Sequence, residues 1–159
     1  MTNPVHIDAP AGVPFIDISR EFDAPVSRLF EAHAKPELVA RWLGFDVDVQ
    51  EWDFVSGGRW RFEDVDGGER YSFRGMFHTV RTDEIAIQTF EYLGFQDVVA
   101  VETLRFTDLG GGRTRLDIHS VYPTIEARDG MVANGMERGV TQGYEKLDAL
   151  LAAQPAPSA

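Results

Sequence analysis

The chain has 159 residues, a net charge of −11 at pH 7 and no cysteine. The lack of cysteine excludes disulfides, thiolate nucleophiles and thiolate metal sites, and the acidic balance disfavours nucleic acid and anionic membrane surfaces as partners. No apolar run approaches the roughly 20 residues that cross a bilayer, and the opening segment "MTNPVHIDAPAGVP" lacks the features of a secretory signal. We therefore expect a cytoplasmic protein that binds neither nucleic acid nor membrane.

The two ends of the chain differ in composition from the rest. Residues 1–12 and 153–159 are rich in Pro and Ala and carry few apolar anchors, so we expect both to be loose tails. Residues 13–152 would then form one domain, since a chain of this length and ordinary hydrophobic content suits a single core.

The first predicted elements are a strand and two short helices. Alternating side chains predict a strand over residues 15–22. Apolar residues then recur at helical spacing before and after Pro36, and Gly44 ends the pattern. Beyond it, alternation between short Gly- and Asp-rich breaks predicts six more strands, over residues 47–54, 59–64, 71–81, 84–92, 98–107 and 114–122.

A helical pattern fills the C-terminal part of the domain. One long helix is predicted from Ile125 to Ala152, with an apolar stripe formed by Val132, Met136, Val140, Tyr144, Leu147 and Leu151. The short breaks favour antiparallel hairpins, and this helix is long enough to cover one face of the sheet. The predicted fold is therefore α+β: a curved seven-stranded antiparallel sheet wrapped around the long C-terminal helix, with an inner space between them.

Hairpin register predicts a polar row on the core face of this sheet. We suppose that Glu91 faces Glu102 across the break "LGFQD". Arg74 then faces Glu91 from the preceding strand, and Trp60 faces Arg74. On the other side, Ser120 faces Glu102. Arg74 can pair with Glu91, which leaves Glu102 without a full cation partner and with a perturbed pKa.

This predicted row fits three hypotheses. It is a salt-bridge cluster at a solvated sheet edge, a lined ligand pocket, or a catalytic pair. In the catalytic case Glu102 is the best candidate acid or base, and Arg74 would stabilise a developing oxyanion. A strongly anionic ligand is not expected unless Glu91 leaves Arg74 free.

Other side chains predicted to face inward are of the kind that lines apolar pockets, although they also suit an ordinary core: Trp42, Trp60, Phe62, Met76, Met136 and Tyr144. His78 is the histidine predicted to face the core beside Met76. No two histidines have metal-ligand spacing, and no phosphate-binding glycine motif or GxSxG occurs. We expect neither a metal nor a cofactor.

Three glycines, Gly135, Gly139 and Gly143, recur every four residues on the predicted long helix. Each costs roughly 1 kcal/mol relative to Ala in a helix. Their common spacing predicts either close backbone approach or spare room beside the helix.

Several strings together resemble the SRPBCC or START-like superfamily, which includes the birch-pollen allergen fold. The branch resembled most is the C-terminal domain of the activator of the ninety-kilodalton heat-shock ATPase, with its bacterial relatives. The strings run in the family's order from Ile18 to Leu151: "ISREFDAPVSRLFEAHAKPELVARWLG", "DFVSGGRWRF", "FRGMFHTV", "TFEY", "ETLRF", "GGRTRLDIHSVYP" and "DGMVANGMERGVTQGYEKLDALL".

The resemblance implies a helix-grip fold with a hydrophobic cavity between the sheet and the long helix. The superfamily includes lipid and polyketide carriers, aromatases and cyclases, an enediyne self-resistance protein and co-chaperones, and it shares no catalytic triad. Its motif residues are mostly architectural: Trp42, Gly57, Gly58, Trp60 and Gly139. Relatives often carry two adjacent tryptophans where this chain has Trp42 and Leu43.

The leading hypothesis is a non-catalytic domain that binds a small hydrophobic or aromatic molecule in this cavity. Its predicted polar contacts are Arg74, Glu91, Glu102 and Ser120. The alternatives are a cyclase-, aromatase- or hydrolase-like enzyme acting on a polyketide-like substrate, and a module that contacts a chaperone ATPase. Neither the identity of the ligand nor the oligomeric state follows from the sequence.

Overall fold

The computed structural model describes residues 3–153. Its strands are β1 (Val5–Asp8), β2 (Phe15–Phe22), β3 (Val47–Trp52), β4 (Arg59–Asp66), β5 (Glu69–Arg81), β6 (Ile85–Tyr92), β7 (Val99–Gly110) and β8 (Arg113–Val121). Its helices are α1 (Val26–Ala34), α2 (Pro36–Trp42), the 3₁₀ turn η1 (Leu93–Phe95), α3 (Ile125–Ala133) and α4 (Met136–Ala153).

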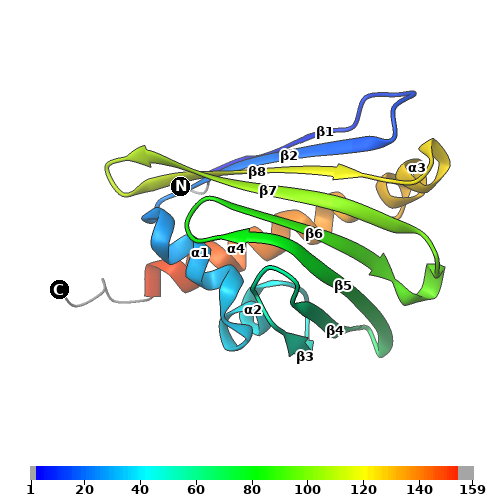
Figure 1. Cartoon of the computed structure of the whole chain (residues 1–159), viewed down its shortest axis with the longest axis horizontal. Helices are drawn as coiled ribbons and strands as arrows, with labels where there is room; N and C mark the ends of the chain where they lie inside the picture. Colours follow the sequence, from blue (N-terminus) through cyan, green and yellow to red (C-terminus); the bar gives the residue numbers. More distant parts are fainter. Residues whose placement is uncertain (1–2, 154–159) are drawn as a thin grey trace.

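All the strands join one antiparallel sheet in the order β1-β2-β8-β7-β6-β5-β4-β3. Figure 1 shows the sheet lying across α4, with α1 and α2 near one end of that helix and α3 beside the end of β8. The predicted α+β helix-grip architecture is therefore confirmed, because the short breaks do form hairpins and the C-terminal helix does cover one sheet face.

The sheet has eight strands where the sequence predicted seven. The additional strand, β1, lies in the segment predicted to be a loose tail, and it pairs with β2 from Val5 opposite Arg20 to Asp8 opposite Asp17. The four residues "VHID" alternate, and they cover an edge of β2 that would otherwise expose unpaired backbone groups. In the predicted C-terminal tail, Ala153 ends α4, and residues 154–159 lie outside the described part of the chain.

The predicted single C-terminal helix is wrong, because two helices take its place. Asn134 caps the end of α3, and Gly135 has a φ of 79°, a left-handed conformation that glycine adopts at little cost. The predicted apolar stripe is interrupted at the same point, since Val132 on α3 is 43 % exposed. From Met136 onward α4 buries Tyr144, Leu147 and Leu151 against the sheet.

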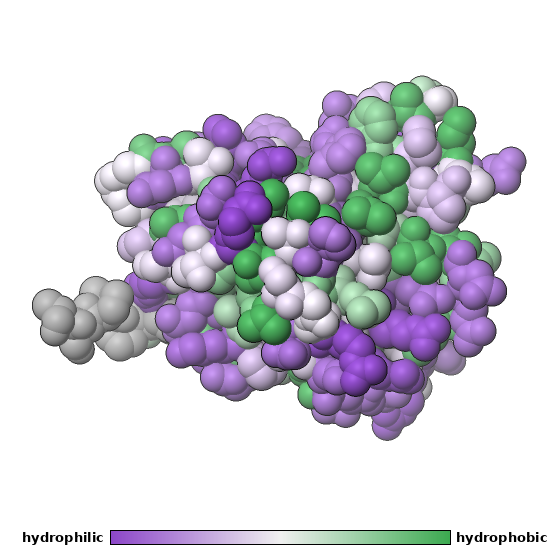
Figure 2. Space-filling view, in the orientation of Figure 1, coloured by the Kyte–Doolittle hydropathy of each residue, from purple (hydrophilic) through white to green (hydrophobic). Residues whose placement is uncertain are grey.

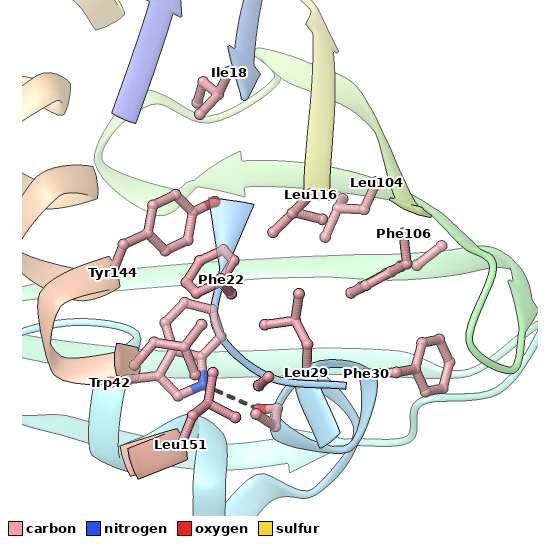
Figure 3. Packing of buried hydrophobic residues seen from close by; sticks show 14 of the residues in the cluster. Ile18, Phe22, Leu29, Phe30, Trp42, Leu104, Phe106, Leu116, Tyr144 and Leu151 are labelled. Carbon is pink, nitrogen blue, oxygen red and sulfur yellow. Dashed lines mark hydrogen bonds between the residues drawn. The ribbon is translucent and has the colours of Figure 1, made fainter. Parts of the chain in front are cut away.

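The main core lies between α4, α1 and the inner face of β2, β8 and β7. Figure 3 shows Tyr144 and Leu151 packed with Phe22 and Trp42, and Leu29 beneath Leu116 and Leu104. A second, aromatic cluster contains Trp60, Phe62 and Phe77 on β4 and β5.

Two indole groups complete the C-terminal end of α1. The Nε1–H of Trp42 donates to the carbonyl oxygen of Ala32 at 3.0 Å, and that of Trp52 donates to the carbonyl of His33 at 2.8 Å. The last carbonyls of a helix have no intrahelical partner. The two tryptophans therefore fix α1 to α2 and to β3, which explains why Trp42 is architectural.

None of the helices within residues 3–153 has both the length and the hydrophobicity needed to cross a membrane.

Candidate functional site

Two of the cross-strand pairs predicted within the polar row are confirmed. Glu102 faces Ser120 in the β7–β8 ladder, and Arg74 faces Glu91 in the β5–β6 ladder. The Arg74 Nε–H donates to Glu91 Oε1 at 2.8 Å. The pairing of β7 with β8 also places Leu104 opposite Ile118 and Phe106 opposite Leu116, as the hairpin argument predicted.

The predicted pairing of Glu91 with Glu102 is wrong. Glu91 faces Val99, and Glu102 faces Gln88, which is an offset of three residues from the predicted register. An odd offset moves a side chain to the other face of the sheet. Glu102 therefore points toward α4, while Glu91 and Arg74 lie on the opposite, outer face.

The β6–β7 connection explains this offset. The connection closes more tightly than the predicted pairing required: Glu91 opposite Glu102 would leave ten residues between the pair, whereas Glu91 opposite Val99 leaves seven. These seven include the turn η1 and Asp97, whose φ is 71°. Glu91 holds this turn, since its Oε2 accepts a hydrogen bond of 2.8 Å from the backbone N–H of Asp97. The guanidinium of Arg74 and this N–H lower the pKa of Glu91, so Glu91 is a structural anion of the outer face.

The predicted place of Trp60 beside Arg74 is also wrong, by one residue. Trp60 faces Gly75, and Arg74 faces Arg61. A Cβ on Gly75 would lie 2.5 Å from Trp60 Nε1 and 2.0 Å from the carbonyl oxygen of Thr89. The indole of Trp60 occupies the space that a Cβ at position 75 would fill, so only glycine fits at that position.

Met76 and His78 do not face the core as predicted. Met76 is 52 % exposed, and His78 is exposed with its Nδ1 2.7 Å from Thr79 Oγ1. Both residues alternate with Arg74, which lies on the outer face with Glu91. The β5–β6 register shifts between Phe77 and Thr79, and this bulge turns Val80, and not His78, toward the core.

Three polar side chains meet on the inner face of the central strands, and we call them the inner polar row: Gln88, Glu102 and Ser120. Gln88 Nε2 donates to Glu102 Oε1 at 3.0 Å, and Ser120 Oγ donates to Glu102 Oε2 at 3.0 Å. Neither partner is a cation, and burial raises the pKa of Glu102 against the smaller opposing effect of these hydrogen bonds.

Sequence reasoning missed Gln88 because β6 alternates in two ways. The set Ile85, Ile87 and Thr89 has the stronger strand propensity, yet the inward set contains Ala86, Gln88 and Phe90. The regular alternation of Ala86, Gln88 and Phe90 was the sequence feature that could have identified the inward face of β6. Only the length of the β6–β7 connection decides which of the two faces points inward.

Two tyrosines flank the inner polar row. The pKa values of Tyr122 and Tyr144 are raised, chiefly by burial and further by the charge of Glu102. Figure 3 shows Tyr144 reaching from α4 with its hydroxyl directed away from Trp42, toward the side of the core where Ile18 lies. The inner polar row therefore lies near the side chains of two tyrosines, within an otherwise apolar interior.

The remaining predicted site residues lie inside the fold. Trp42, Trp60 and Phe62 are buried, and Met136 is half-buried against the main core. Trp60 stacks on Phe62 with ring centroids 5.5 Å apart, and its Nε1 has no hydrogen-bond partner among the described residues. The structure thus separates the predicted set into an inner group and an outer group, the latter formed by Arg74, Met76, His78 and Glu91.

The outer face has its own features. An open hollow of about 510 Å³ is lined by side chains that include Arg59, Arg61, Arg74, Met76 and Glu91. A smaller hollow of about 260 Å³ lies over β1, β2, β8 and β7. In Figure 2, hydrophobic surface interrupts the hydrophilic surface on the visible side of the molecule.

The inner polar row offers hydrogen bonding but no metal site. Within residues 3–153, no group of three His, Asp or Glu side chains is placed to hold a metal ion. A carboxyl group with a raised pKa can donate one hydrogen bond when protonated and accept several when ionised. The row can therefore orient a ligand oxygen, or exchange a proton with one.

Similar folds occur among solved structures. A protein of Rhodobacter sphaeroides is 24 % identical with a TM-score of 0.84, and protein Ms6760 of Mycobacterium smegmatis is 24 % identical with a TM-score of 0.85; in both cases the match covers 96 % of this chain and 100 % of the other. DynU16, described as a putative protein in the dynemicin biosynthetic locus, is 21 % identical with a TM-score of 0.68 over 88 % of this chain and 48 % of its own.

No curated protein matches the chain. The model of one protein family matches residues 23–152, which contain α1, α2, most of the sheet, α3 and nearly all of α4. The chain therefore belongs to the family described as activator of Hsp90 ATPase homolog 1-like protein.

Proposed function

We propose that this domain binds a small apolar or aromatic molecule between the sheet and α4, with an oxygen of the ligand held by the inner polar row. The observation that carries the proposal is Glu102. It faces α4 from a central strand, its hydrogen-bond partners are neutral, and burial raises its pKa. Burying a carboxyl group without a cation partner costs stability, so its presence at this position supports a functional role.

Residual exposure on the inner face supports space for a ligand. Gln88, Phe90, Glu102 and Ile118 lie on central strands and face the helix side, yet all are half-buried rather than buried. A core without free space would cover these positions, since protein interiors are close-packed. Apolar walls with a few placed polar groups are the usual composition of a small-molecule site.

The chemistry of the row narrows the ligand. A protonated Glu102 donates a hydrogen bond to a carbonyl oxygen, and an ionised Glu102 accepts one from a phenol or alcohol. Gln88 and Ser120 both direct their donors to Glu102, so they fix the orientation of the carboxyl rather than compete with it. A mostly apolar molecule with one ketone or hydroxyl group fits this arrangement.

Calorimetric titration with neutral naphthols and naphthyl ketones tests the proposal. Quenching of tryptophan fluorescence is a second readout, since Trp42 and Trp60 lie in the interior. Saturable binding is expected, and Glu102→Gln and Ser120→Ala should each change the affinity of compounds that carry the oxygen, but not of naphthalene itself. Glu91→Gln, on the outer face, is the matched control. Equal effects of the Glu102 and Glu91 substitutions, or no binding at all, would contradict the proposal.

Proton transfer to the bound molecule is a second candidate function, and the raised pKa of Glu102 favours it. Arg74 cannot stabilise an oxyanion there, because it lies on the outer face with Glu91. Similarity to a protein from a biosynthetic locus is compatible with such chemistry. Solvent deuterium exchange into the α-carbon of a bound ketone, abolished in Glu102→Gln, would distinguish catalysis from binding.

Contact with a chaperone ATPase is a third candidate, because the family description names an activator of the Hsp90 ATPase. The outer face exposes Met76, Val99, Val101 and Val121 on neighbouring strands, and such patches often mark protein contacts. Stimulation of the ATPase that is lost in Val101→Glu but kept in Glu102→Gln would support this function. Ligand binding without any ATPase effect would remove it.

A further inference from the structure

A second unusual polar group lies in α3, at one end of the space between the sheet and α4. Arg128 is 3 % exposed, and neither its Nε nor its Nη1 has a hydrogen-bond partner within residues 3–153. Its Nη2 lies 2.7 Å from Asp129 Oδ1, on a side chain that is 58 % exposed. One edge of the guanidinium is thus held near solvent, while the rest is enclosed without partners.

The placement of α3 directs this side chain inward. Helix α3 packs against β2 and α4, and Figure 1 shows it at the end of β8 beside the beginning of α4. Ala127 and Met131 on α3 pack against the main core. Arg128 lies three residues before Met131 and is itself buried, so its side chain lies on the same side of the helix as Met131.

The inner polar row is close to Arg128 along the chain. Ser120 lies near the end of β8, and Thr124 then caps α3 by accepting a hydrogen bond of 3.0 Å from the backbone N–H of Ala127. Arg128 lies one turn further into the helix. The cap holds the first turn of α3 in place, which places the guanidinium beyond the end of the strand that carries Ser120.

Asp129 meets Nη2, but the enclosed Nε–H and Nη1–H groups have no acceptor among the described residues, which is costly unless a ligand supplies one. Guanidinium groups are matched to carboxylates, whose oxygens accept charge-assisted hydrogen bonds. The side chains that α3 and the first turns of α4 pack against the main core are apolar, namely Ala127, Met131, Met136 and Val140. The complementary ligand is therefore apolar over most of its surface and anionic at one end.

We propose that Arg128 is the binding residue for the carboxylate of an apolar monocarboxylic acid, aliphatic or aromatic, whose body occupies the space next to the inner polar row. This inference rests on the proposed function and specifies its ligand class. It also replaces Arg74, which the sequence suggested as the interior cation and which pairs with Glu91 on the outer face.

Calorimetric titration at pH 7.5 with two matched pairs of compounds tests the inference. The pairs are naphthalene-2-carboxylate with naphthalene-2-carboxamide, and decanoate with decanamide. Each pair shares one apolar body, so the difference within a pair isolates the carboxylate. The wild-type protein is expected to bind the acids at least tenfold more tightly than the amides, a comparison that needs no variant.

Two variants assign that preference to Arg128. Arg128→Met should lose at least tenfold in affinity for the acids and stay within twofold for the amides. Arg128→Lys should retain an intermediate preference, because an ammonium keeps the charge but not the planar donor geometry. Arg41→Met, at an exposed position on α2, is the matched control and should change neither affinity. Circular dichroism confirms that each variant is folded.

The outcomes separate the two proposals. Equal binding of acids and amides by the wild type, or a preference for acids that survives Arg128→Met, overturns this inference and leaves the proposed function standing. Binding of neither acids nor amides overturns this inference, and the proposed function is then decided separately by the titration with naphthols and naphthyl ketones.

Discussion

Arg20 on β2 and Asp148 on α4 are joined by two hydrogen bonds of 2.6 Å each. Arg20 is 2 % exposed, and its guanidinium also lies 4.6 Å from the ring centroid of Phe22. The pair ties the covering helix to the inner face of the sheet, and its two parallel hydrogen bonds fix the orientation of α4 as well as its distance.

Asp148→Ala should therefore lower the free energy of unfolding by about 3–5 kcal/mol, since it leaves Arg20 buried without a counter-charge. Urea melts at pH 7 measure the loss. Glu145→Ala, at an exposed position on the same helix, is the control and should change stability by less than about 0.5 kcal/mol. The double variant Arg20→Met with Asp148→Leu should recover much of the loss. A loss below about 1 kcal/mol in Asp148→Ala would show that solvent screens the pair.

The two glutamates of the predicted row should respond to amidation with opposite signs. The folded state raises the pKa of Glu102 and lowers that of Glu91. Glu102→Gln removes a carboxylate that folding disfavours, so it should stabilise the protein at pH 7 by about 1 kcal/mol. Glu91→Gln removes one that folding favours and should destabilise it, by less than about 1 kcal/mol because its partner Arg74 is more than half exposed.

The pH dependence of Glu102 checks the same assignment. Because its folded-state pKa is raised, the folded state retains a proton that the unfolded state releases. Wild-type stability should therefore gain relative to Glu102→Gln as the pH falls through that raised pKa, and the difference should level off below the unfolded value of 4.5. A stability difference between the two proteins that does not change with pH would contradict the assignment. The same melts with Glu91→Gln should show the opposite trend.

His33 should make the fold sensitive to mild acid. It is buried in α1 with its Nδ1 2.8 Å from the carbonyl oxygen of Leu29, and burial lowers its pKa from 6.5 to about 4. Above pH 6.5 both states are neutral at this side chain, but between pH 6.5 and 4 the unfolded state gains a proton that the folded state resists. Stability should fall by about 3 kcal/mol over that interval, at about 1.4 kcal/mol per pKa unit.

Denaturant melts of wild type and His33→Phe between pH 4 and 7 measure this contribution by difference. The variant should lose that part of the pH dependence, whereas His6→Gln, at an exposed position on β1, should keep it. If His33→Phe retains the full dependence, protonation of His33 is not its cause.

Glycine substitutions should separate close packing from open space. At Gly75 a Cβ would overlap Trp60 and the backbone of β6, so Gly75→Ala should cost about 1–3 kcal/mol. At Gly139 on α4 no atom lies within 4 Å of the Cβ position, so Gly139→Ala should stabilise the protein by up to about 1 kcal/mol. Thermal melts compare the two variants directly. Destabilisation by Gly139→Ala would mean that this helix position is not open.

The sequence by itself determined most elements of this fold, although not β1 or the division of the C-terminal helix into α3 and α4. Alternation and turn residues located β2 at residues 15–22 as observed, and located the other six predicted strands to within a few residues. These signals are local, because side-chain period and backbone dihedral preference are properties of a few consecutive residues. The β7–β8 register was also predictable, since the "DLGGG" break closes a tight hairpin and places Glu102 opposite Ser120.

Tertiary structure decided which face each residue occupies. β6 alternates equally well in two phases, and only the length of the turn near Asp97 selects the phase that directs Gln88, and not Glu91, toward the core. Loop conformation and bulges depend on contacts distant in sequence, and an error of one residue in register reverses the face. The same limit hid Arg128, because a charged residue on an amphipathic helix becomes notable only when packing encloses its guanidinium without a partner.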